Sequence, residues 1–510
     1  MARHAEDDLS SSLAIELPAS RATDTALEAK LNTCSTPYGD SLSHEQPGTN
    51  HGVSSALEAG IRSPSPSSTS IHFSESTSLP KWNDPPINRW RFGAANFSFI
   101  ILGMNDAAYG ALIPYLETYY DISYTVVSLV FLSPLLGYVT SAILNNMIHM
   151  KFGQRGVAIL GPSAHLIAYI IVCLHPPYPV LVVAFIVAGF GNGISDAAWN
   201  AWLGGMANAN ELLGFLHAFY GLGGTLAPTI ATSLITKANW KWFQFYYLVV
   251  GAACLELIFL TTTFWNATGA KYREENRPSG TNFEGSNNSR DNNGARNNER
   301  LSKKMDQVIR RMFGNSRTAE ALRNKVTWIC SAFLAIYVGA EVGLGGWIVT
   351  FMIRIRHGSP FASGMTSTGF WLGITVGRVI LGFVTPRLFK TEKHAVAVYL
   401  LCCVGLELLF WLIPQFYISA VMVSFLGFFL GPLFPAGIVA ATKLLPKHLH
   451  VSAIGFAAAM GASGATALPF AIGAIAQAKG VSVLQPFTLA LLVVCLGIWM
   501  CLPSLSKKTQ

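Results

Sequence analysis

The chain contains two apolar blocks of similar length that carry the same landmarks in the same order. The first block runs from about residue 91 to 266 and the second from about 325 to 503. Each block has an acidic residue in the middle of its first apolar segment, Asp106 and Glu341. These acids and two later pairs of glycine-containing strings lie 235 to 241 residues from their partners. A duplicated apolar block of this kind predicts two structural repeats around a central cavity, as in membrane transporters.

The composition supports a membrane protein. Mean hydropathy is +0.40, and 12% of the 510 residues are charged, about half the usual share of a soluble domain. The formal net charge of +8 arises from basic residues beside apolar segments, which membrane topology explains better than nucleic-acid binding does. The eight cysteines show no metal-ligand or disulfide spacing. We therefore expect a lipid bilayer around the protein, no nucleic-acid partner, and neither a metal nor another cofactor.

Twelve apolar segments are long enough to cross a bilayer as helices. Backbone polar groups in lipid must be paired internally, and a helix achieves this within one segment. The sequence therefore predicts an all-α integral membrane protein with twelve transmembrane helices in two pseudo-symmetric six-helix halves. The predicted limits are 94–116, 126–148, 156–175, 179–204, 211–235, 242–265, 326–352, 362–385, 394–413, 416–441, 451–477 and 484–503.

Polar segments flank and join the two halves, which are assigned to residues 89–266 and 326–503. Residues 1–88 are rich in Ser, Thr, Pro, Glu and Asp, which predicts a disordered tail without a signal peptide. Residues 267–325 form a linker with thirteen Lys or Arg against seven acids, and residues 504–510 form a short polar tail.

The distribution of basic residues predicts the orientation. An even number of spans puts both termini and the linker on one side of the membrane, and connectors on that side hold more Lys and Arg than those on the other. The two sets are Lys151, Arg155, Arg387, Lys390, Lys393, Lys443 and Lys447 against Lys237, Lys241, Arg354, Arg356 and Lys479. Basic connectors stay in the cytosol. We expect both termini and the linker to be cytoplasmic, in a monomer of the plasma membrane.

Three polar residues of the fourth predicted span, Asn192, Asp196 and Asn200, are spaced four apart and share one helical face, flanked by Trp199. Facing lipid, this stripe would be unsatisfied, so it should face the bundle interior. It either binds solute or ions, or holds helices together. Its coincidence with the Asn105–Asp106 pair of the first span favours binding. A carboxyl group in such surroundings favours its neutral form, which suits a proton carrier.

The second half offers Glu341 with Trp347 less than two turns later. A carboxylate beside an indole suits a polyol, because the acid accepts hydroxyl hydrogens and the ring covers an apolar face. His217 and Arg378 are further ionisable groups within predicted spans. Arg378 either contacts solute or neutralises an acid. The sequence therefore predicts a cavity with candidate groups from both halves.

Several short strings in these spans form a recognisable set: Gly189–Asn200, Leu216–His217 before Gly221–Gly224, Gly339–Glu341 before Trp347, and Gly377–Arg378. With them, the chain resembles a major facilitator superfamily transporter over about residues 90–503. Within that superfamily it resembles the fungal branch of the fucose-permease-like sugar:proton symporters. The resemblance implies that Asp106 and Asp196 take part in handling protons and sugar.

The chain departs from the superfamily's pattern in one loop, and the family architecture suggests roles for two further residues. The superfamily's loop signature after the second span is degenerate, because Met150 replaces its acid while Lys151 and Arg155 remain. That signature normally provides a charged latch for one access state. The family architecture also places Glu256 and Glu407, in the similar strings LELIF and LELLF, on peripheral helices, where we expect structural roles. His165 is interpreted as a packing histidine.

These features predict a secondary transporter that moves a small solute by alternating access, coupled to protons, with a sugar implied by the resemblance. Export of a fungal secondary metabolite and a nutrient sensor that moves no solute are the two alternatives. The sequence has no Gly-rich nucleotide loop followed by Lys-Ser or Lys-Thr, and no soluble catalytic domain. An enzyme and an ATP-driven pump are therefore not expected.

Overall fold

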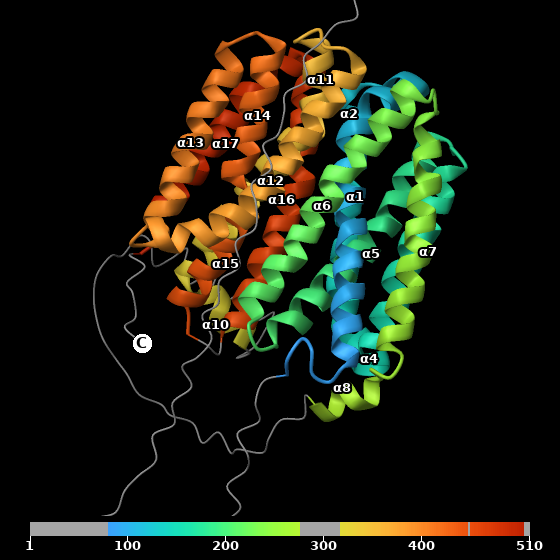
Figure 1. Cartoon of the computed structure of the whole chain (residues 1–510), viewed down its shortest axis with the longest axis vertical. Helices are drawn as coiled ribbons and strands as arrows, with labels where there is room; N and C mark the ends of the chain where they lie inside the picture. Colours follow the sequence, from blue (N-terminus) through green and yellow to red (C-terminus); the bar gives the residue numbers. More distant parts are fainter. Residues whose placement is uncertain (1–79, 276–316, 447–448, 504–510) are drawn as a thin grey trace, which may run out of the picture. The chain divides into compact units, whose positions relative to one another are not determined.

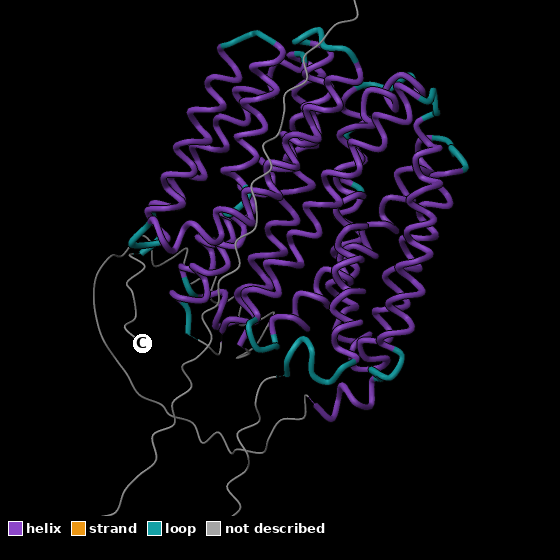
Figure 2. The backbone as a smooth tube through the Cα atoms, in the orientation of Figure 1, coloured by secondary structure: helices purple, strands orange, loops and turns teal. Residues whose placement is uncertain are grey.

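The computed structural model describes residues 80–275, 317–446 and 449–503. Regular structure in these ranges is helical (Figure 2), apart from an isolated β-bridge between Lys81 and Asp84. The expected all-α fold is confirmed. Most of the predicted disordered tail and most of the central linker lie outside the described residues.

The helices of the first half follow the predicted segments (Figure 1). They are α1 (Ile87–Tyr120), α2 (Tyr124–Val127), α3 (Leu129–Leu132), α4 (Pro134–Cys173), α5 (Tyr178–Gly204), α6 (Ala209–Lys237), η1 (Trp242–Gln244), α7 (Phe245–Phe264) and α8 (Gly269–Glu275).

The second half repeats this order. Its helices are α10 (Arg317–Arg323), α11 (Lys325–Arg354), α12 (Pro360–Leu388), α13 (Glu392–Leu412), α14 (Phe416–Leu430), α15 (Leu433–Leu444), α16 (His450–Lys479), η3 (Val481–Val483) and α17 (Leu484–Met500).

The described residues hold eleven apolar helical segments long enough to cross a membrane, and one of them, Tyr124–Cys173 with 50 residues, is long enough to cross twice. A straight helix of that length would measure about 75 Å, more than twice the hydrocarbon thickness. Gly153 interrupts it with φ 71° and ψ −164°, and a Cβ there would lie 2.4 Å from the Ala267 carbonyl oxygen. Tyr178, which follows the segment, donates hydrogen bonds to the carbonyls of Val126 and Val127 near its start, so the chain returns to the end of the bundle where the segment begins. The predicted twelve spans are confirmed.

The predicted tenth span is not continuous. It divides into α14 and α15 around Gly431 and Pro432. A Cβ at Gly431 would lie 2.5 Å from the Ile374 carbonyl oxygen on α12, so only glycine permits this approach. The break brings the Gly431 carbonyl within 3.2 Å of Arg378 Nε. Proline and glycine thus create a backbone acceptor inside the bundle.

The halves meet where α1 packs on α11 and α6 on α12. Gly110 allows the first contact, because a Cβ there would lie 2.2 Å from the Gly345 carbonyl oxygen. Beyond it, Arg354 forms an ion pair with Glu117 at 3.4 Å, and the Tyr124 amide donates to the Gln477 side chain at 2.8 Å. These contacts hold the halves together at the end of the bundle where α1 finishes.

Candidate functional site

A cavity of about 140 Å³ lies between the halves. Its wall includes five of the predicted ionisable residues: Asp106, Asp196, His217, Glu341 and Arg378. They come from α1, α5, α6, α11 and α12, so no single span forms the site. The structure therefore assembles ionisable groups from both repeats around one space.

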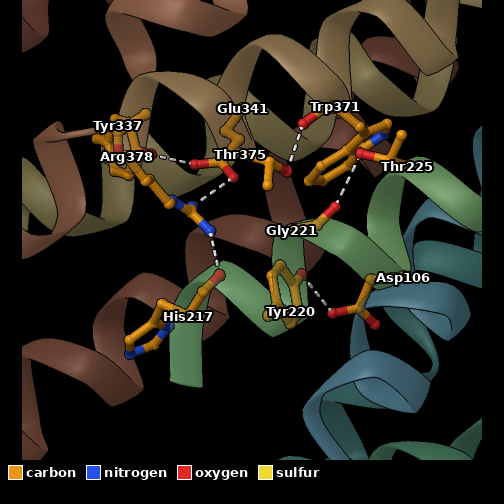
Figure 3. A network of polar contacts seen from close by, with 11 residues as sticks. Asp106, His217, Tyr220, Gly221, Thr225, Tyr337, Glu341, Trp371, Thr375 and Arg378 are labelled. Atoms are coloured by element: carbon orange, nitrogen blue, oxygen red, sulfur yellow. Dashed lines mark hydrogen bonds and ion pairs between the residues drawn. The ribbon is translucent and has the colours of Figure 1, made fainter. Parts of the chain in front are cut away.

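Asp106 is held by neutral donors. Its Oδ1 accepts hydrogen bonds from the side-chain amides of Asn105 at 3.0 Å and Asn192 at 3.3 Å. Its Oδ2 accepts from the Tyr220 hydroxyl at 2.8 Å (Figure 3). A hydroxyl can either donate or accept. Tyr220 can therefore donate to a carboxylate or accept from a protonated Asp106 without a large movement.

The two asparagines support Asp106 from behind. Asn105 is buried, and its amide also donates to Tyr109 at 2.9 Å while its carbonyl accepts from Tyr169 at 3.2 Å. Asn192 is fully buried, with its amide directed at Asp106. Neither lines the cavity. Both predicted cavity residues therefore orient the carboxyl group that does.

The polar stripe of α5 serves two different carboxyl groups. Asn192 bonds Asp106 on α1, whereas Asn200 donates to Asp196 on its own helix at 2.9 Å. Asp196 lines the cavity, and Asn200 does not. The predicted common face thus carries one cavity acid between two supporting amides.

The acid of the second half has a different environment. Arg378 Nη2 forms an ion pair with Glu341 Oε1 at 3.0 Å, and the Tyr337 hydroxyl bonds the other carboxylate oxygen (Figure 3). Arg378 also donates to the backbone carbonyls of Gly431 at 3.2 Å and His217 at 3.3 Å. Of the two roles left open for Arg378, the structure shows the neutralising one. The pair still borders the cavity, and its bond to His217 links the halves.

A comparison of the whole sequence with protein families agrees with this architecture. The family model described as Major Facilitator Superfamily matches residues 95–469. The chain belongs to the major facilitator superfamily. It is therefore a multi-pass membrane protein built for secondary transport, as the duplicated blocks and the shared cavity indicate.

Two known proteins are similar in sequence. "Bypass of stop codon protein 6" of Saccharomyces cerevisiae is 30% identical over 410 residues, covering 78% of this chain and 79% of that protein. "Glucose/mannose transporter GlcP" of Bacillus subtilis is 21% identical over 380 residues, covering 74% of this chain and 85% of that protein.

Two solved structures share the fold. A D-xylose–proton symporter superposes with a TM-score of 0.63 at 12% identity, covering 83% of this chain and 99% of the other. A single-residue variant of the Escherichia coli fucose:proton symporter FucP superposes with a TM-score of 0.56 at 13% identity, covering 81% of this chain and 98% of the other. The chain therefore has the fold of the sugar:proton symporters that its sequence resembles.

Besides the three asparagines, the two tryptophans that were predicted to line the cavity also lie away from its wall. Trp199 is fully buried against Phe264, with ring centroids 4.6 Å apart. Trp347 is fully buried, and its indole nitrogen donates to the Pro469 carbonyl at 2.9 Å. Its ring meets Tyr124 of the other half at 5.8 Å. Trp347 thus packs between the halves and does not stand beside Glu341 as a sugar-covering ring.

Other aromatic residues take that place. The cavity wall includes Phe99, Tyr138, Tyr220 and Phe434, none of which was predicted from the sequence. The His217 ring lies between Phe99 and Phe434, with centroids 5.8 and 5.2 Å away. A helical-face argument could have found Tyr220, since it follows the predicted His217 by three residues. The other three required knowledge of how the helices pack.

Proposed function

We propose that this facilitator is a proton-coupled transporter of a small uncharged polar solute, with a sugar as the substrate class. The observation that carries this proposal is the contrast between two repeat-related acids. Glu341 is paired with Arg378, whereas the partners of Asp106 are neutral amides and a hydroxyl. A buried carboxyl group without a cation gains electroneutrality by binding a proton. Asp106 is therefore the proposed proton carrier, with Asp196 as a second candidate.

The lining supports the choice of solute. Rings such as Tyr138 and Phe434 can cover the apolar face of a sugar, while Asp196 and Tyr220 offer hydrogen bonds. Arg378 already has Glu341 as its counter-ion, so the wall has no unpaired cation to attract an anionic solute. The xylose and fucose symporters and the glucose/mannose transporter, to which the chain is similar, are named for sugars, which agrees with this class.

Alternating access assigns a state to the observed conformation. The contacts between Glu117 and Arg354 and between Tyr124 and Gln477 close the cavity at one end. The basic connectors predict that this end is extracellular and that both termini are cytoplasmic. The closed contacts then belong to a state that is shut on the extracellular side of the plasma membrane.

Purified protein in sealed vesicles tests the proposal, with radiolabelled D-glucose, D-mannose, D-xylose and L-fucose as probes. We expect uphill accumulation of at least one sugar under an imposed proton gradient, abolished by a protonophore. Asp106→Asn should lose accumulation but retain exchange of labelled for unlabelled sugar, because a neutral side chain resembles the protonated state. Glu407→Gln, a buried carboxyl outside the cavity, is the matched control. Uphill transport driven by sodium, or equal accumulation by Asp106→Asn, would contradict the proposal.

The same vesicles separate import from the alternatives. Expulsion of an apolar probe against its gradient, with no sugar uptake, would indicate the exporter. Binding of a sugar without any flux across the vesicle membrane would indicate the sensor.

A further inference from the structure

A second ionisable cluster lies in the first half, away from the cavity wall. Glu256 on α7 accepts a hydrogen bond from Ser98 Oγ on α1 at 2.6 Å, and its other oxygen lies 3.0 Å from His165 Nδ1 on α4. All three side chains are fully buried. The sequence suggested separate structural roles for Glu256 and His165, whereas the structure joins them into one pair.

This pair is connected to the cavity acid through Tyr169. The His165 ring stacks on the Tyr169 ring, with centroids 5.9 Å apart and planes at 17°. Tyr169 donates to Asn105, and Asn105 donates to Asp106. The pair therefore lies outside the cavity wall and is connected to Asp106 through the residues that support it.

The number of protons on the pair decides its charge. With one proton between Glu256 and Nδ1 and none on Nε2, the pair carries one negative charge. With a second proton on Nε2 the pair is neutral, whether the first proton resides on the carboxyl or on the ring. Nε2 has no hydrogen-bond partner and is fully buried against Gly191, whose added Cβ would lie 2.7 Å from it. The pair with one proton therefore lacks a counter-charge, and the pair with two protons lacks a hydrogen-bond acceptor for Nε2–H.

The titratable groups described around the pair supply no positive charge to compensate Glu256. They are Tyr169 on α4, Tyr246 on α7, whose ring lies 6.0 Å from that of Tyr169, and Asp106 on α1. All are acids or hydroxyls. Within residues 80–275, 317–446 and 449–503, no Lys or Arg forms an ion pair with Glu256. The pair can therefore reach neutrality by taking up a proton.

We propose that Glu256 and His165 together form a second proton-binding site, whose charge acts on Asp106 from outside the cavity wall. Ser98, which touches Glu256, and Asp106 are eight residues apart on α1, or about 12 Å. At an effective dielectric constant of about 20, one charge at that distance moves a protonation equilibrium by about one pH unit. The effect on transport rests on the proposed proton coupling, but proton binding by the pair does not.

Infrared pH-difference spectroscopy of the purified protein tests the site without any solute. Between about pH 5 and about pH 8, where imidazole and buried carboxyl groups titrate, the wild type should change its carboxyl or imidazole bands. Glu256→Gln should lose that set of bands. Glu407→Gln should keep it, because Glu407 is equally buried, stands in a matching string, and has no hydrogen-bond partner among the described residues. An unchanged difference spectrum in Glu256→Gln would overturn the proposal.

Ser98→Ala keeps the test decisive if Glu256→Gln fails to fold. It removes one donor to the carboxylate and leaves both titratable groups in place. The bands should persist, but the pH at which they change should differ from that of the wild type, because the carboxylate has lost a hydrogen bond. Bands that change at the same pH in Ser98→Ala and in the wild type would count against the site.

Vesicle uptake then tests the coupling to Asp106. Glu256→Gln should shift the pH dependence of uptake by up to about one unit, because the charge that acts on Asp106 then no longer changes with the protonation of Glu256. Band loss without this shift would leave proton binding in place and refute the coupling. Wild-type uptake without any pH dependence would refute the proposed function and leave the spectroscopic result intact.

Discussion

The ion pair between Glu341 and Arg378 allows a quantitative test of the second half. The side chains are 4% and 8% exposed, so removing one partner leaves a charge that water cannot reach. Breaking a buried pair in this way typically costs about 3–5 kcal/mol. Replacing both partners by neutral side chains removes both charges and is often nearly neutral in stability. We therefore expect Glu341→Gln and Arg378→Met each to destabilise the fold by about 3–5 kcal/mol.

The double variant should recover most of that loss, for a coupling energy of several kcal/mol. Arg378 also donates to the carbonyls of Gly431 and His217, which would keep a residual cost of about 1–3 kcal/mol for the unpaired acceptors. Equilibrium unfolding of purified protein by increasing detergent denaturant, run as a double-mutant cycle, measures these values. If the two single costs simply add in the double variant, the pair does not stabilise the fold as argued.

Three further predictions concern the cavity and the contacts between the halves. Tyr220→Phe should lower proton-driven uptake about tenfold or more with unchanged expression, because it removes a hydrogen bond to the Asp106 carboxyl, and initial rates in vesicles measure this. Gly110→Ala should push α1 from α11, favouring the state open at the end where they now touch, and the labelling rate of a cysteine engineered there by an impermeant maleimide would report it. Trp347→Ala should cost about 3–5 kcal/mol of stability and leave the half-saturating sugar concentration unchanged in the protein that remains folded, measured by thermal unfolding and uptake.

Each has its own control. Tyr246→Phe removes a buried hydroxyl that has no hydrogen-bond partner among the described residues and does not line the cavity, so it should leave uptake unchanged; equal losses in Tyr246→Phe and Tyr220→Phe would count against the role of the bond to Asp106. Gly93→Ala lies on the same helix as Gly110 with open space around it, and equal labelling in both glycine variants would disprove the steric argument. A Trp347→Ala variant that binds sugar more weakly at full stability would restore the direct role suggested by the sequence.

The limits of most spans were predictable because they depend on the chain alone. The fourth span was expected at 179–204 and is found at Tyr178–Gly204, since His175 and the prolines after it end the preceding apolar run. The first was expected at 94–116, yet α1 extends over Ile87–Tyr120, because a helix can continue beyond the apolar core. The break between α14 and α15 was not predicted, since glycine and proline inside a span can also be accommodated in a continuous helix.

The candidate site divides in the same way. Their place within long apolar segments identified Asp106, Asp196 and Glu341 as interior acids, because a charged group in such a segment must avoid lipid. The sequence also suggested that Trp199 and Trp347 line the cavity, which the structure does not show. Which side of a helix faces a cavity, and which faces a neighbouring helix, depends on packing partners that are remote in sequence.

The sequence by itself thus determined that this chain spans a membrane twelve times, in two related halves with an acid at the centre of each. The length of the apolar segments and the spacing of the repeats are properties of the sequence, and they determine how the chain crosses the bilayer. Only the tertiary structure determined that the two related acids, Asp106 and Glu341, have different partners. Glu341 meets Arg378 from the next helix, 37 residues away, whereas Asp106 meets a tyrosine 114 residues away and amides. Charge compensation depends on contacts of a few ångströms between helices, so only the packed bundle separates the acid that is paired with a cation from the acid that is held by neutral groups.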